Sequence, residues 1–104
     1  MVIHVVYRGF SPTVAIKRRL DAARAEFEKL FKGLVSVEWA IESEGSAVVV
    51  SCRVHSRSRY YRAAAQSHDP MQAVREVADR LLAQRRRAHA AIKGRRRKAA
   101  AKRT

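Results

Sequence analysis

Hydrophobic residues recur at every second position along several short segments of this chain, and this period is typical of a β-strand that buries one face. Ile3, Val5 and Tyr7 form the first such series. The same pattern continues in three later segments, although the alanines of the last one are weak strand formers and favour a place at a sheet edge. We therefore expect strands over residues 3–8, 35–42, 47–55 and 60–66.

Two longer segments have the hydrophobic spacing of amphipathic helices. The first is expected over residues 12–32, because Ser11 stands before a proline as an N-cap and a glycine follows the last turn. Asp69 also precedes a proline, and a second helix is expected over residues 70–93. Its hydrophobic positions end at Leu82, so its second half should project into solvent or onto a partner.

The expected order of elements is β-α-β-β-β-α. A strand, a helix and a second strand at these lengths favour a right-handed crossover between parallel neighbours, and the following hairpins add antiparallel strands. The sequence thus predicts an α+β fold, a two-layer sandwich in which two helices cover one face of a four-stranded mixed sheet.

Charge is distributed very unevenly along the 104 residues, which suffice for one domain. Residues 80–104 hold eleven Lys and Arg and no Asp or Glu, whereas residues 1–79 hold twelve basic and nine acidic side chains. We expect a folded RNA-binding domain over residues 1–93 and a disordered basic tail over residues 94–104. The usual partner of such a cationic end is the phosphate backbone of a nucleic acid.

Other functional classes find little support in the sequence. The longest uninterrupted hydrophobic run is far shorter than a membrane span, no secretory signal precedes the first strand, and we expect a cytoplasmic protein. The single cysteine, Cys52, lies in a predicted strand and is interpreted as a core residue, as is Trp39. No spacing of metal ligands and no catalytic arrangement is evident, so we expect no metal, no cofactor, no small-molecule substrate and no enzymatic activity.

The candidate RNA-binding residues are basic side chains in three segments. On the second helix they lack acidic neighbours, and their mutual repulsion would weaken a helix that made no use of them. On the first helix Asp21 and Glu28 stand close by, so surface ion pairs are an alternative there. The candidates are Arg80, Arg85, Arg86, Arg87, His89 and Lys93 on the second helix, Lys17, Arg18 and Arg24 on the first, and Arg57, Arg59 and Arg62 around the last hairpin.

Tyr60 and Tyr61 begin the last predicted strand and allow two interpretations. Their rings could stack on unpaired bases of RNA. Tyrosines at the start of a strand more often cover the sheet, and this second interpretation is favoured.

Several residues of the two helices resemble a known protein family. They are Ala15-Ile16 and Phe31 in the first helix and Asp69, Ala73-Val74, Asp79-Arg80-Leu81 and Gln84 in the second. The second set is similar to the pattern of aspartate, tyrosine, alanine and isoleucine, then aspartate-lysine-leucine and arginine-glutamine, of the bacterial hibernation-promoting factor, ribosome-associated inhibitor A and sigma-54 modulation protein family. The chain departs from it at Pro70-Met71 and at Arg85, and looks like a short form without the additional dimerisation domain of longer members.

The resemblance implies a factor that binds the small ribosomal subunit and its rRNA near the decoding centre and occludes the sites of mRNA and tRNA. We expect a monomer when the protein is free. Two alternatives remain open from the residues themselves: an RNA or DNA chaperone that is not specific to the ribosome, and a structural component of a ribonucleoprotein.

Overall fold

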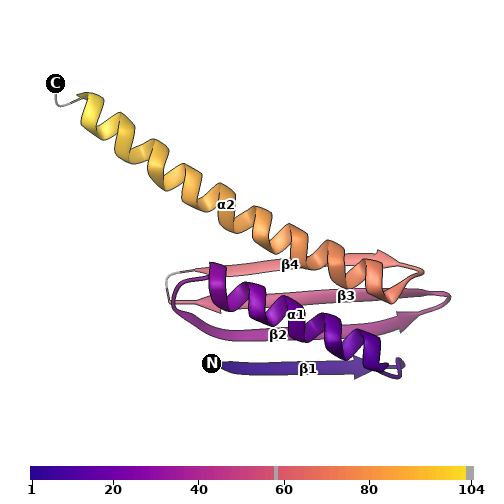
Figure 1. Cartoon of the computed structure of the whole chain (residues 1–104). Coiled ribbons are helices and arrows are strands. Elements are labelled where there is room, and N and C mark those ends of the chain that lie inside the picture. Colours follow the sequence, from indigo (N-terminus) through magenta and orange to yellow (C-terminus); the bar gives the residue numbers. More distant parts are fainter. Residues whose placement is uncertain (58, 103–104) are drawn as a thin grey trace.

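The computed structural model describes the backbone of residues 1–57 and 59–102 and side chains as far as residue 88. Its elements follow the expected order, β-α-β-β-β-α (Figure 1). They are β1 (Val2–Arg8), α1 (Val14–Leu30), β2 (Leu34–Glu44), β3 (Ala47–Ser56), β4 (Tyr60–Ser67) and α2 (Pro70–Lys102).

The strands form one mixed sheet in the order β1-β2-β3-β4, with β1 and β4 at its edges. β1 runs parallel to β2, and the other neighbours are antiparallel. Both helices lie on the same face (Figure 1), where α2 packs against β3, β4 and α1, and α1 packs against β2. The predicted α+β sandwich is therefore confirmed, and within residues 1–57 and 59–102 the opposite face of the sheet carries no layer of helices.

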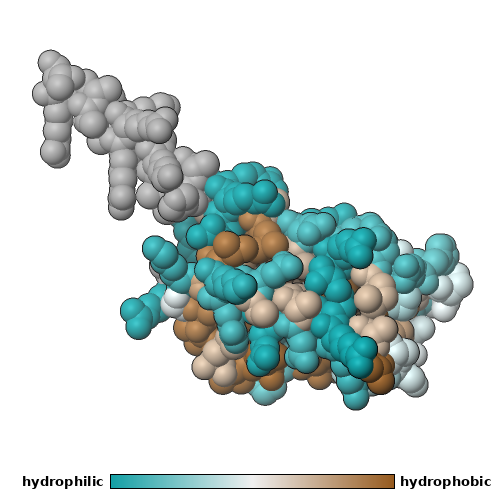
Figure 2. Space-filling model, viewed as in Figure 1, coloured by the Kyte–Doolittle hydropathy of each residue, from teal (hydrophilic) through white to brown (hydrophobic). Residues whose placement is uncertain are grey.

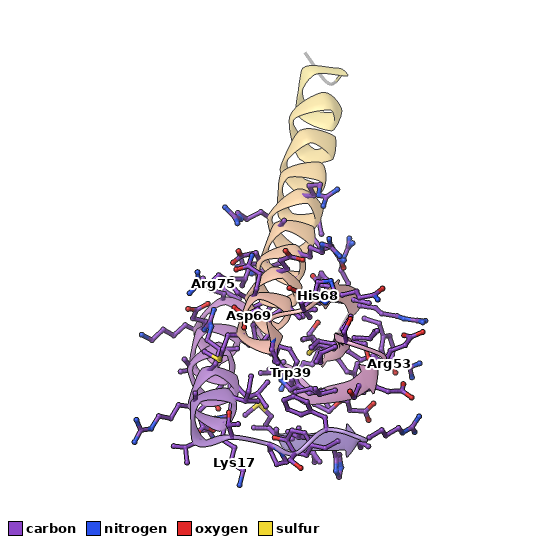
Figure 3. All side chains as sticks on the ribbon, turned by 90° about the vertical axis from the view of Figure 1, so that its right-hand side faces the viewer. Lys17, Trp39, Arg53, His68, Asp69 and Arg75 are labelled. Carbon is purple, nitrogen blue, oxygen red and sulfur yellow. The ribbon has the colours of Figure 1, made fainter. Side chains whose placement is uncertain are left out.

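The core between helices and sheet is built around aromatic rings. The Phe27 ring lies 6.2 Å from that of Trp39 and 5.5 Å from that of Phe31, measured between centroids. Trp39 is buried between the two layers (Figure 3), as expected. Cys52 is buried beside it in the sheet, and burial raises the pKa of its thiol, with Glu38 adding to the effect. Its predicted role as a core residue is confirmed.

The first helix begins two residues later than the sequence indicated. Thr13, rather than Ser11, is the N-cap: its backbone is extended and its Oγ1 accepts a hydrogen bond of 3.2 Å from the Ile16 backbone N–H. Thr13 lies three residues before Ile16, the first buried residue of the apolar stripe, and this spacing lets one side chain satisfy a free N–H of the first turn. Pro12 therefore precedes the helix instead of starting it.

This assignment predicts that Thr13→Ala lowers the free energy of unfolding by about 1 kcal/mol, the usual cost of losing an N-cap. Ser11→Ala is the matched control and should leave stability unchanged, because Ser11 is exposed and lies before the helix. Urea denaturation of the two variants would measure the difference. Equal losses, or a larger loss for Ser11→Ala, would contradict the assignment.

The second helix begins as predicted and continues further. Asp69 caps it, since its Oδ1 accepts a hydrogen bond of 3.0 Å from the Met71 backbone N–H. The backbone remains helical to Lys102, beyond the expected end at Lys93. Residues 95–103 are all Arg, Lys or Ala, which are strong helix formers. The division into a domain of residues 1–93 and a tail of residues 94–104 stays a prediction.

Candidate nucleic-acid interface

Two side chains of α2 fix this helix to the outer edge of β4. Arg80 donates from its guanidinium group to the Ala64 carbonyl. One turn later the Gln84 side-chain amide donates to the Arg62 carbonyl at 2.7 Å and accepts from the Arg62 backbone N–H at 3.4 Å. The Gln84 amide thus pairs with the edge strand as a neighbouring backbone would.

The spacing of these contacts determines where the rest of α2 lies. The four residues from Arg80 to Gln84 rise by about 6 Å along a helix, and the two residues from Ala64 to Arg62 span about 7 Å along a strand. The helix therefore runs beside β4 towards the start of that strand. Arg85, Arg86 and Arg87 follow directly on the side of Gln84 towards the start of β4, and beyond them α2 rises away from the sheet and extends past it (Figure 1).

The three arginines after Gln84 are accessible. Arg86 and Arg87 are exposed and Arg85 is half-buried, while the Arg86 Nε donates to the Leu82 carbonyl at 3.5 Å. Figure 2 shows hydrophilic residues gathered where α2 leaves the body. No acidic residue occurs in the sequence from Arg80 onwards. The side chains of the predicted contacts His89 and Lys93 lie outside the described residues.

The turn between β3 and β4 places two further predicted residues at this end. The Arg57 backbone N–H donates to the Gly33 carbonyl at 2.9 Å, and the Ser56 backbone N–H donates to the Arg59 carbonyl at 2.9 Å. Gly33 has a φ of +66°, and the stem of Arg57 lies so close above it that an added Cβ would approach the Cγ to 3.0 Å. Both arginines are exposed. We call Arg57, Arg59, Arg85, Arg86 and Arg87 the arginine end.

The remaining predicted residues lie elsewhere. Lys17, Arg18 and Arg24 are exposed on α1. Arg62 is exposed on the opposite, open face of the sheet, although the sequence had grouped it with Arg57 and Arg59. Arg62 alternates along β4 with the half-buried Tyr61 and the buried Ala63, which face the helices, and this alternation explains its position. Most predicted residues with described side chains thus lie on α1 or in the arginine end, Arg80 contacts β4, and Arg62 lies apart from them on the open face of the sheet.

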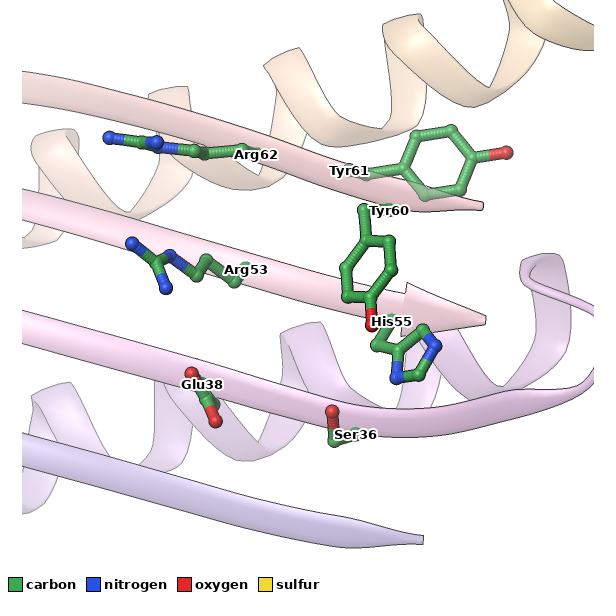
Figure 4. A pocket seen from close by; sticks show the side chains of 7 residues that line it. All are labelled: Ser36, Glu38, Arg53, His55, Tyr60, Tyr61 and Arg62. Carbon is green, nitrogen blue, oxygen red and sulfur yellow. The ribbon is translucent and has the colours of Figure 1, made fainter. Parts of the chain in front are cut away.

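Sequence reasoning missed a second group of side chains, which lies around Arg62. A shallow cavity of about 510 Å³ on the open face is lined by Ser36, Glu38, Arg53, His55, Tyr60, Tyr61 and Arg62 (Figure 4). Arg53 and Arg62 are directly opposite each other in the pairing of β3 with β4. The period-2 pattern indicates that such residues share a face, but only the strand register brings them together.

The described part of the chain holds neither a cluster of three or more His, Cys, Asp or Glu suited to a metal ion nor a helix long and apolar enough to span a membrane. All buried side-chain nitrogen and oxygen atoms of the described residues have hydrogen-bond partners. The exposed guanidinium groups of the arginine end are suited to bind anions.

Comparisons with known proteins identify the fold. No protein-family model matches the chain, and no curated protein matches it by sequence. The N-terminal domain of Protein Y from Thermus thermophilus is similar, with a TM-score of 0.74 and 20% identity over 84% of this chain and 98% of that one. A ribosomal subunit interface protein from Coxiella burnetii is also similar, with a TM-score of 0.72 and 15% identity over 86% of this chain and 99% of that one. The chain thus has the fold of these two proteins.

Proposed function

We propose that this protein is a ribosome-binding factor that occupies rRNA of the small subunit near the decoding centre and blocks the sites of mRNA and tRNA. The observation that carries the proposal is the arginine end, which α2 and the turn between β3 and β4 form in a fold similar to that of a ribosomal subunit interface protein. The mechanism is occlusion, without a catalytic step or a cofactor. The protein acts in the cytoplasm and is a monomer when it is not bound to the ribosome.

The geometry supports recognition of folded RNA by shape. Arginine is suited to this task because its planar group grips phosphate with two hydrogen bonds or stacks on exposed bases. The contacts of Arg80 and Gln84 with β4 fix α2 relative to the sheet, so Arg85 and Arg87 keep a defined distance from Arg57 and Arg59. A fixed array of cations fits one arrangement of phosphates better than others, which favours a structured partner such as rRNA.

The test is sedimentation of lysate from cells that express the chain, in a sucrose gradient at low salt. We expect the protein to travel with small subunits or whole ribosomes and to be released as the salt rises from roughly 50 to 200 mM, since phosphate contacts weaken steeply over this range. A protein that stays at the top of the low-salt gradient would contradict ribosome binding.

Competition separates this function from that of a general nucleic-acid chaperone, which the cationic end would also suit. An excess of unrelated structured RNA should leave most of the protein on the ribosome if the site is specific. Purified protein should also displace mRNA and tRNA from isolated small subunits. If unrelated RNA removes the protein in proportion to its phosphate concentration, the chaperone is the better description.

A further inference from the structure

The two tyrosines at the start of β4 have different environments. Tyr61 is half-buried, and its ring packs edge-on against Phe31 with centroids 4.9 Å apart. Tyr60 is 78% exposed and lies on the other face of the sheet. The sequence favoured for both residues a role in covering the sheet: Tyr61 covers the side that faces the core, whereas Tyr60 covers His55 on the open face.

The Tyr60 ring is held in place by a histidine. It lies parallel to the His55 ring on β3, with centroids 4.1 Å apart and an interplanar angle of 5°. These residues are direct partners in the pairing of the two strands. One face of the Tyr60 ring contacts His55. Since the residue is nevertheless largely exposed, the other face of the ring is open to solvent. A positioned aromatic ring with a free face is the element on which single-stranded nucleic acids stack their bases.

Charged side chains lie on the next row of the same face. Glu38, Arg53 and Arg62 are direct neighbours across β2, β3 and β4, and they line the cavity with Tyr60 (Figure 4). This row is two residues further along the strands, about 7 Å from the His55 and Tyr60 pair. A base and the phosphate attached to it span a comparable distance.

The order of charges across this row gives the ligand an orientation. Arg62 is on the edge strand and presents a guanidinium group for a phosphate, whereas Glu38 lies towards the middle of the sheet and would repel one. A carboxylate instead accepts hydrogen bonds from the exocyclic amino group of a base. The backbone of a bound strand would thus follow β4, with the base edge directed to Glu38.

We propose that this open face is a stacking site for an unpaired, amino-bearing base of single-stranded RNA, which we call the Tyr60 site. The Tyr60 site adds to the proposed function a second RNA contact, on the face of the sheet opposite the helices. It rests on that function, because the proposed ribosomal partner supplies the RNA strand. Tyr60 begins β4 at the end of the sheet that the arginine end occupies. One RNA strand that passes around this end reaches both surfaces.

The test measures binding of the full chain to fluorescently labelled six-nucleotide oligomers of cytidine and of uridine by anisotropy at low salt. The two pyrimidines have the same ring size, and only cytosine carries an amino group. We expect Tyr60→Ala to weaken cytidine binding roughly 5- to 100-fold, the range for loss of one aromatic platform. Tyr60→Phe keeps the ring and should stay within about twofold of the original protein.

A second variant tests the base preference. The original protein should bind the cytidine oligomer more tightly than the uridine oligomer, roughly 5-fold or more, and Glu38→Gln should reduce this preference. Equal affinity of the Tyr60→Ala and original proteins for cytidine, with folding confirmed by circular dichroism, would overturn the Tyr60 site. The same equal affinity is expected if the open face binds a segment of another protein instead of RNA, so this result would also overturn the Tyr60 site.

The outcomes for the Tyr60 site and for the proposed function are distinguishable. If Tyr60→Ala weakens oligomer binding as expected while the original protein fails to sediment with ribosomes, the stacking site stands and the ribosomal function fails. If the original protein sediments with ribosomes and Tyr60→Ala leaves oligomer affinity unchanged, the function stands and the stacking site fails.

Discussion

Replacing Phe27 by alanine should lower the free energy of unfolding by about 3–5 kcal/mol, the typical cost of removing a fully buried aromatic side chain. Phe27 has no exposed surface, and its ring lies nearly parallel to Trp39 and edge-on to Phe31. The substitution removes both contacts and leaves a cavity between α1 and the sheet. Because a domain of this size has only about 5–15 kcal/mol of stability in total, a large part of it would be lost.

Urea denaturation monitored by the fluorescence of Trp39, the only tryptophan of the chain, would measure this loss directly. Leu30→Ala is the matched control: it removes a large hydrophobic side chain from the same helix, but one that is 40% exposed. Its cost should stay below about 1 kcal/mol. If Phe27→Ala does not fold at all, Phe27→Leu should fold with a loss of roughly 1.5 kcal/mol. Similar losses for Phe27→Ala and Leu30→Ala would contradict the central role of the Phe27 ring.

The period of the hydrophobic pattern was sufficient to predict the layers of this fold. Ile3, Val5 and Tyr7 face the helices, and Val50, Cys52 and Val54 continue the same layer, because alternation in a strand reports directly on burial. The start of α2 was also predictable, since Asp69 is followed by proline and no better cap stands nearby. At α1 both Ser11 and Thr13 were suitable caps, and residue preference alone does not distinguish them.

The arrangement of the candidate sites depended on information that a single sequence does not contain. Gln84 gave no signal of its role, because its contact with Arg62 arises only when α2 lies beside an unpaired strand edge. The stack of His55 on Tyr60 requires the register of β3 with β4, which a shift of one residue would abolish. Basic residues were recognised individually by their charge, whereas their distribution over the two faces follows from this register.

Arg85→Glu combined with Arg87→Glu should weaken binding to isolated small ribosomal subunits roughly 10- to 100-fold at moderate salt, as expected for the loss of two phosphate contacts. The plot of log affinity against log salt concentration should become shallower by about 1.5–2. Neither residue belongs to the buried core, so stability should change little. Titration of labelled protein with subunits at several salt concentrations would measure affinity and slope together.

Charge reversal also reduces the net charge of +14, and this effect must be separated from the loss of specific contacts. Arg8→Glu combined with Arg75→Glu is the matched control, because both residues are exposed and lie outside the arginine end. Arg8 ends β1, and Arg75 is in the second turn of α2. We expect this control to weaken binding less than about threefold, since charges more than a Debye length from the contact are largely screened.

The two double variants together test whether position or total charge determines binding. If both lose affinity equally, the protein acts as a general polycation and the arrangement of its arginines has no role. If Arg85→Glu with Arg87→Glu binds as tightly as the original protein, this part of α2 is not the contact surface. Arg85→Lys with Arg87→Lys refines the positive result: it should keep the salt slope but lose part of the affinity, because an ammonium group retains the charge and lacks the planar two-pronged grip on phosphate.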